Sequence, residues 1–265
     1  MDARQISESM FYNNQFFEDE LIYENFEKIT AVENKEALKA MGGKENLKNK
    51  KILDLGCGIG DITVYFALQG AEVYGIDVSN KMINDAKNLA QKYNVEDSCT
   101  FTEGAAENLD FKDNYFDFVF GNGILHHANI PKTMEEIHRV LKKDGKALFI
   151  EPLTYNPIIN IYRKIATKVR SEGEKPLTLK DFKIIKKYFN RMEHKEFWFF
   201  SQYLFMHFYL EGCNPNHTKY WKKIIKDADK YRKIFKPLKY LDDIVLKILP
   251  FLRPLCWTTV IKLTK

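Results

Sequence analysis

A glycine-rich segment directly after an apolar run is the part of the chain whose residues could most readily do chemistry. Gly56, Gly58 and Gly60 are spaced two apart, and Asp54 precedes them. Glycine lacks a Cβ, so it adopts positive φ and lets the backbone approach a ligand closely. A helix that starts just after such a turn offers free N–H groups and partial positive charge. The pattern indicates a nucleotide-like ligand; a generic tight turn is the alternative.

The composition of this segment narrows the class of ligand that it could bind. Dinucleotide-binding loops place two residues between the second and third glycines, and phosphate-binding loops of the G-x-x-x-x-G-K-[ST] type supply a lysine. Neither feature occurs here. Asp54, at the carboxyl end of the first predicted strand, would repel a pyrophosphate group and favours a cationic ligand.

A second acid ends the next apolar run. Asp77 lies 17 residues after Gly60. A carboxylate in this place can accept hydrogen bonds from both hydroxyls of a ribose. The alternative is an aspartate that only caps the helix expected after Ser79.

Two adjacent histidines follow the fourth apolar run, in the segment that also contains Asn122 and Gly123. Ligands of open α/β sheets bind beyond the carboxyl ends of the strands, which is where this segment should lie. Neutral histidine can accept a proton near pH 7, so His126 and His127 are candidate bases. The alternative is one structural histidine and one surface histidine.

The elements that must position these residues alternate between strand and helix patterns. Strands are expected at 51–57, 72–78, 99–102, 116–120 and 146–150, with helices at 61–68, 81–93 and 131–141 between them. Such alternation predicts a parallel sheet with helices on both faces. Later segments predict helices at 158–169 and 178–188, a strand at 193–200, a basic helical region at 216–249 interrupted by Pro237, and a terminal strand at 257–263. Residues 7–41 have helix-like apolar spacing, which predicts helices before the first strand; the apolar positions are Phe16, Leu21, Ile22, Phe26 and Ile29.

Together these motifs resemble class I S-adenosylmethionine-dependent methyltransferases, of the type 11-like, small-molecule subgroup. The resemblance is strong over about 50–152 and weaker beyond. It implies a Rossmann-like α/β fold: a seven-stranded, mostly parallel sheet with the last strand antiparallel, helices on both faces, and helical caps at both ends of the chain. The expected division is an N-terminal cap at 1–45, a cofactor-binding core at 46–152 and a substrate-side elaboration at 153–265.

The resemblance also implies residue roles toward S-adenosyl-L-methionine, whose ammonium and sulfonium groups suit an acidic site. Ala105 stands where many relatives have aspartate, so the backbone N–H groups of Ala105 or Ala106 are expected to contact adenine. The cofactor-binding set implied is Asp54, Gly56, Cys57, Gly58, Asp77, Val78, Ala105, Ala106, Asn122 and Gly123.

For catalysis we expect direct displacement, with a base needed only where the acceptor carries a proton at neutral pH. His126 and His127 are the first candidates, and Tyr155 and Glu151 the second. No metal ligand set is indicated. The segment after 122 has neither the [DNS]-P-P-[YFW] pattern of amino-group nucleic-acid methyltransferases nor a nucleophilic cysteine. A small or lipophilic acceptor is therefore favoured over nucleic acid.

Charge and aromatic residues are unevenly distributed. Residues 1–150 carry a net charge of −8 and residues 151–265 a net charge of +13. The aromatic stretch 197–210 fits core packing of a cap, an apolar acceptor pocket, or an interfacial surface helped by nearby lysines. The alternative function is thus a non-catalytic cofactor-binding or membrane-peripheral regulatory protein, and an RNA methyltransferase is the weaker alternative. The sequence does not indicate the oligomeric state.

Four scattered cysteines, the absence of an apolar leader and the absence of a long uncharged apolar run favour a cytoplasmic location.

Overall fold

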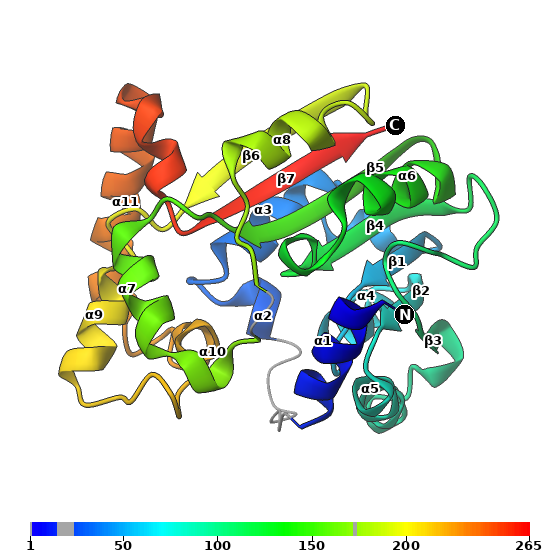
Figure 1. Ribbon diagram of the computed structural model, residues 1–265, viewed down its shortest axis with the longest axis horizontal. Helices are drawn as coiled ribbons and strands as arrows, with labels where there is room; N and C mark the ends of the chain where they lie inside the picture. The colour runs from blue at the N-terminus through cyan, green and yellow to red at the C-terminus, as the bar shows by residue number, and fades with distance from the viewer. Residues whose placement is uncertain (1, 15–23, 172–173) are drawn as a thin grey trace.

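The computed structural model describes residues 2–14, 24–171 and 174–265 of the chain. Its centre is a seven-stranded sheet of order β3-β2-β1-β4-β5-β7-β6 (Figure 1). The strands are β1 Lys51–Leu55, β2 Glu72–Asp77, β3 Cys99–Glu103, β4 Phe116–Asn122, β5 Leu141–Pro152, β6 Arg191–Phe197 and β7 Thr258–Thr264. All neighbouring strands pair in parallel except β7, which is antiparallel to β5 and to β6. The predicted seven-stranded, mostly parallel sheet is confirmed.

The central strands are apolar on both sides because helices cover both faces of the sheet. Neighbouring residues of one strand point to opposite faces. Phe120 of β4 packs in one hydrophobic core with Phe66, whereas Val119 packs in the other core with Leu53 and Met134.

Three helices connect the parallel strands: α4 Asp61–Leu68, α5 Asn80–Lys92 and α6 Ile130–Val140. Ser79 caps α5, since its side chain accepts a hydrogen bond from the Met82 N–H. Asn129 caps α6 in the same way, and Pro131 lies in the first turn of that helix.

The N-terminal helices are α1 Ala3–Asn13, α2 Glu24–Glu27 and α3 Val32–Ala40. Helix α1 packs against α5. In Figure 1, α1 lies beside the loops at the carboxyl ends of the strands. The predicted apolar positions Phe16, Leu21 and Ile22 lie outside the described residues.

The C-terminal part contributes α7 Pro157–Ile165, α8 Leu179–Ile185, α9 Tyr203–Leu210, α10 Tyr220–Lys226 and α11 Arg232–Ile248. In Figure 1, α7, α9, α10 and α11 gather at one side of the molecule. The predicted break at Pro237 is wrong, because α11 continues through this residue and the interruption falls between α10 and α11. Proline removes one N–H donor, and buried anchors on either side of it, Phe235 and Asp242, keep the helix in place.

The aromatic stretch divides between the core and the surface. The strand predicted at 193–200 ends at Phe197, where Trp198 adopts a positive φ of 67°. Trp198, Phe205 and Phe208 are buried, as the core-packing interpretation predicts. Exposed apolar side chains from the same stretch are Phe200, Tyr203, Met206, Tyr209 and Leu210.

Candidate functional site

A cavity of about 330 Å³ opens at the carboxyl ends of β1, β2 and β4. Most of the cofactor-binding residues predicted from the sequence line it: Asp54, Gly56, Cys57, Gly58, Asp77, Val78, Ala106, Asn122 and Gly123. Ala105 is not among the lining residues, although its neighbours Gly104 and Ala106 are. The sheet therefore brings together segments that are up to 70 residues apart in the chain.

The glycine loop forms one wall of the cavity. Gly56, Gly58 and Gly60 all have positive φ, of 71°, 53° and 81°. A Cβ on Gly60 would stand 2.8 Å from that of Ala86, so this glycine also permits α4 and α5 to pack closely. In the part of the chain that the structure describes, no atom lies within 4 Å of the place a Gly58 Cβ would take. Gly58 therefore leaves backbone accessible to a ligand.

Asp54 is a buried acid at the end of β1. Its carboxylate accepts a 2.6 Å hydrogen bond from the Thr63 hydroxyl. Burial raises the pKa of Asp54 to about 7. Asp54 is therefore incompletely ionised at neutral pH, and a cationic ligand in this cavity would favour its ionised form.

Asp77, at the end of β2, holds the glycine loop. One carboxylate oxygen accepts the Gly58 N–H at 3.0 Å, and the other accepts the Ser79 N–H at 2.9 Å. Burial raises the pKa of Asp77 above its ordinary value, although these hydrogen bonds oppose the effect. The α5 cap is Ser79, so the capping alternative does not describe Asp77. Its remaining acceptor capacity faces the cavity that it lines.

Glu151 orders the loop that carries the histidine pair. Its buried carboxylate accepts the N–H groups of Ile124 at 2.9 Å and Leu125 at 2.7 Å. It also lies 2.7 Å from His126 Nδ1. Burial and the neighbouring His127 lower the pKa of His126, with Glu151 opposing them. Neither Glu151 nor His126 lines the cavity, so this pair positions the loop beneath it.

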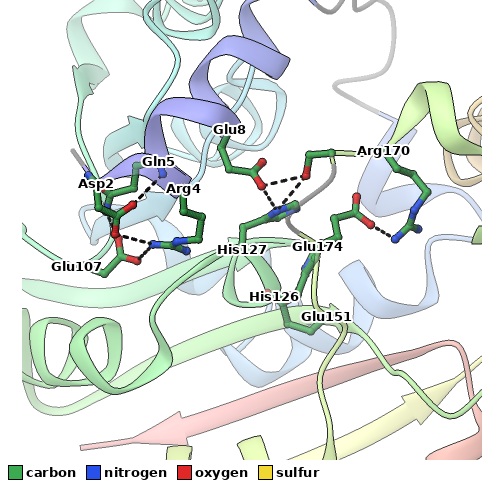
Figure 2. Close-up of polar contacts among 11 residues, drawn as sticks. Asp2, Arg4, Gln5, Glu8, Glu107, His126, His127, Glu151, Arg170 and Glu174 are labelled. Atoms are coloured by element: carbon green, nitrogen blue, oxygen red, sulfur yellow. Dashed lines mark hydrogen bonds and ion pairs between the residues drawn. The ribbon is translucent and has the colours of Figure 1, made fainter.

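His127 does line the cavity, and its partner comes from α1. Nδ1 of His127 lies 3.0 Å from the Glu8 carboxylate, which also accepts a 3.0 Å hydrogen bond from the Ser171 hydroxyl (Figure 2). Burial raises the pKa of Glu8, but the bonds from His127 and Ser171 outweigh it and leave this pKa lowered. Glu8 was not predicted from the sequence, because no local pattern links it to a histidine 119 residues away.

Helix α1 is held over the cavity at both ends. Arg4 pairs with Glu107, and the Gln5 side-chain amide donates to the same carboxylate at 2.9 Å (Figure 2). At the other end, the Ser79 hydroxyl donates to the Asn13 side chain at 2.6 Å. Five α1 residues line the cavity: Arg4, Gln5, Glu8, Phe11 and Tyr12.

Tyr155, the remaining candidate base, lies elsewhere. Its hydroxyl accepts a 3.0 Å hydrogen bond from the Leu179 N–H, its side chain is exposed, and it does not line the cavity. The C-terminal part contributes other cavity residues that the sequence analysis did not single out: Val169, Glu174, Lys219, Trp221, Lys222 and Ile225.

Residues 53–149 match a family model for a methyltransferase domain. Over 103 residues the chain is 38% identical to a 2-phytyl-1,4-naphtoquinone methyltransferase of Nostoc punctiforme, covering 37% of this chain and 45% of that protein. It is 39% identical over 127 residues to a demethylmenaquinone methyltransferase of Chlorobaculum parvum, covering 46% and 50%. The match thus spans half or less of these relatives.

Solved structures extend the likeness of fold over nearly the whole chain. The structure of geranyl diphosphate C-methyltransferase from Streptomyces coelicolor aligns with a TM-score of 0.65 at 12% identity, covering 99% of this chain and 98% of that one. Phosphoethanolamine N-methyltransferase 2 of Haemonchus contortus aligns with a TM-score of 0.59 at 20% identity, covering 97% and 60%. At these identities the likeness shows the Rossmann-like methyltransferase fold alone.

Proposed function

We propose that this chain, whose residues 53–149 match a methyltransferase domain, binds S-adenosyl-L-methionine and transfers its methyl group to a small or lipophilic acceptor. The observation that carries the proposal is a pair of acids, the buried Asp54 and the half-buried Asp77, beside a glycine loop that opens onto one cavity. The cofactor has two cationic groups and a ribose, which are the partners that such acids suit.

In this assignment Asp54 attracts the cationic amino acid end of the cofactor, and Gly56, Cys57 and Gly58 give its backbone contacts. Asp77 accepts hydrogen bonds from the ribose hydroxyls, with Val78 beside it. The backbone near Ala105 and Ala106 contacts adenine, and Asn122 and Gly123 lie beside the sulfonium. All of these residues except Ala105 line the cavity, which supports the assignment.

The acceptor enters between the two caps, 1–45 and 153–265, that complete the cavity around the core at 46–152. Apolar groups on these caps, Phe11, Val169, Trp221 and Ile225, favour a lipophilic molecule. The two relatives named above are quinone methyltransferases by name, which supports an acceptor of that general character.

Transfer is a direct displacement. The attacking atom of the acceptor forms a bond to the methyl carbon as the carbon–sulfur bond breaks, and the electron pair of that bond remains on the sulfur of S-adenosylhomocysteine. Because the sulfonium is already activated, alignment supplies much of the acceleration. An acceptor that carries a proton loses it at the His126–His127 pair, where His127 reaches the cavity.

Calorimetry with S-adenosylmethionine and S-adenosylhomocysteine tests cofactor binding. We expect both to bind, and Asp77→Asn to weaken binding at least tenfold because a charged acceptor of the ribose hydroxyls is lost. Folded protein that binds neither compound would overturn the proposal. Labelled cofactor, incubated with separated lipid, small-molecule, protein and RNA fractions, then identifies the acceptor. Binding without transfer to any fraction would instead favour the non-catalytic alternative.

A second proposal, contact with a membrane surface, rests on the exposed face of α11. Tyr240, Ile244 and Ile248 repeat every four residues on this helix and are exposed, as are Leu241 and Phe251 beside them. Exposed basic residues flank this stripe: Arg232, Lys233, Lys236, Lys247 and Arg253. An apolar stripe bordered by cations matches the surface of an anionic bilayer. Among the described residues, no helix has the length and apolar character needed to cross a membrane.

A further inference from the structure

A third potential metal ligand, Glu174, lies beside the two histidines, and the proposed transfer reaction does not use it. His126, His127 and Glu174 each place one donor atom so that all three lie within 4.8 Å of one another. The two imidazole rings are stacked at an angle, with centroids 4.0 Å apart. Glu174 comes from a distant loop, and both it and His127 line the cavity.

Both imidazoles are oriented by carboxylates. Nδ1 of His126 lies 2.7 Å from Glu151, and Nδ1 of His127 lies 3.0 Å from Glu8. With Nδ1–H donating to a carboxylate, Nε2 of each ring carries the lone pair. Over the described ranges, neither Nε2 has a hydrogen-bond partner. Metal-binding histidines characteristically donate their second N–H to a carboxylate, which fixes the ring and strengthens the ligand.

The charges around the pair favour a cation. The carboxylates of Glu8, Glu151 and Glu174 and the guanidinium of Arg170 together carry a net formal charge of −2 next to the two rings. Arg170 pairs with Oε2 of Glu174, so Oε1 remains available as a ligand. Figure 2 shows Glu174 between the imidazoles and Arg170.

We propose that His126, His127 and Glu174 bind a divalent cation of the zinc class at the acceptor end of the cavity. Two imidazole nitrogens and one carboxylate suit Zn²⁺, Co²⁺ or Fe²⁺, whereas Mg²⁺ prefers oxygen ligands. Three protein ligands leave a coordination position open to a further ligand.

The open coordination position of the cation indicates a class of acceptor. This part of the inference rests on the proposed function. An acceptor hydroxyl or phenol that binds the cation becomes a stronger acid. Its proton would pass to solvent, and the oxygen would bond the methyl carbon with the electron pair that it keeps, while the carbon–sulfur bond breaks and leaves its own electron pair on sulfur. In this state the cation would take the place of the imidazole base.

Metal titration of tag-free, chelator-treated protein tests the site directly. We expect one equivalent of Zn²⁺ to bind per chain, Co²⁺ to bind with visible absorption bands, and Mg²⁺ not to compete. His127→Gln and Glu174→Gln should each weaken Zn²⁺ binding at least tenfold, and Glu8→Gln by about 10- to 100-fold, the range seen when carboxylates that orient metal-binding histidines are removed.

His194→Gln is the matched control, because His194 also pairs with a glutamate, Glu196, but belongs to no three-ligand cluster among the described residues. This variant should bind Zn²⁺ as the unmodified protein does. Absence of stoichiometric binding, or unchanged affinity in both His127→Gln and Glu174→Gln, would overturn the metal site. Calorimetry of Glu174→Gln with S-adenosylmethionine separates the two proposals: retained cofactor binding beside lost metal binding supports both, whereas a metal-binding chain without cofactor binding sinks only the proposed function.

Discussion

At the scale of single residues, burial opposes the ionisation of Asp54. Its pKa rises from an ordinary 3.8 to about 7 on folding. Between these values the folded chain holds a proton that the unfolded chain releases, so Asp54 makes stability fall as pH rises from about 4 to 7. We expect urea unfolding of Asp54→Asn at pH 4.5 to 7.5 to show a stability that declines less with pH than that of the unmodified protein. Equal slopes for the two proteins would contradict the raised pKa.

The same residue predicts a proton linked to cofactor binding. A cationic ligand favours ionised Asp54, so binding at pH 6.5 should release a proton that the ligand-free protein holds. The apparent enthalpy of S-adenosylmethionine binding should then differ between phosphate and Tris buffers by a fraction of their difference in ionisation enthalpy. Asp54→Asn should abolish this difference. A buffer-independent enthalpy in the unmodified protein would remove Asp54 from the cationic end of the cofactor.

At the scale of elements, α1 is held over the cavity by polar contacts at both ends, and Glu107 makes those at the N-terminal end. This carboxylate accepts from Arg4, from Gln5 and from the Asn129 backbone. Glu107→Ala should loosen α1 and raise the dissociation constant of S-adenosylmethionine several-fold. The reason is that α1 must then become ordered when the cofactor binds, and this ordering costs conformational entropy. Hydrogen exchange at residues 5–13 should increase in this variant while exchange in β1 and β4 stays slow.

Lys44→Ala is a matched control for that measurement, since among the described residues Lys44 makes only a long, exposed ion pair with Glu27, and it does not line the cavity. It should leave both exchange in α1 and cofactor affinity unchanged. Faster exchange in α1 without any loss of affinity in Glu107→Ala would show that this helix does not cover the bound cofactor.

The sequence predicted what local patterns determine. Asp54, Asp77 and the glycines are recognisable because a strand end and a turn set their spacing, and the sheet follows from apolar runs that alternate with amphipathic helices. Glu8 and Glu174 were missed because they meet the histidines only through contacts 119 and about 50 residues apart. The continuity of α11 through Pro237 was missed for a similar reason: the hydrogen bonds that anchor Asp242 come from Phe200 and Ser201.

At the scale of the whole molecule, the C-terminal helices contribute both to the cavity and to an exposed apolar surface. Trp221 and Ile225 of α10 line the cavity, and α11 follows directly in the chain. The exposed stripe on α11 includes Tyr240, which is 69% exposed, and Ile248, which is 68% exposed. The C-terminal helices that form a wall of the cavity would therefore also contact a bilayer in which a lipophilic acceptor is dissolved.

Vesicle sedimentation tests this arrangement. The protein should sediment with vesicles that contain phosphatidylserine, less with neutral vesicles, and less at high salt, because the exposed lysines and arginines on α11 contribute an electrostatic part of the affinity. Ile248→Glu combined with Phe251→Glu should reduce binding more than tenfold, since each buried apolar side chain contributes about 1.5–3 kcal/mol. Ile161→Glu, at an equally exposed position of α7, should not. Equal losses in both variants would indicate a general effect of added charge, and unchanged binding in the α11 variant would exclude this face as the membrane contact.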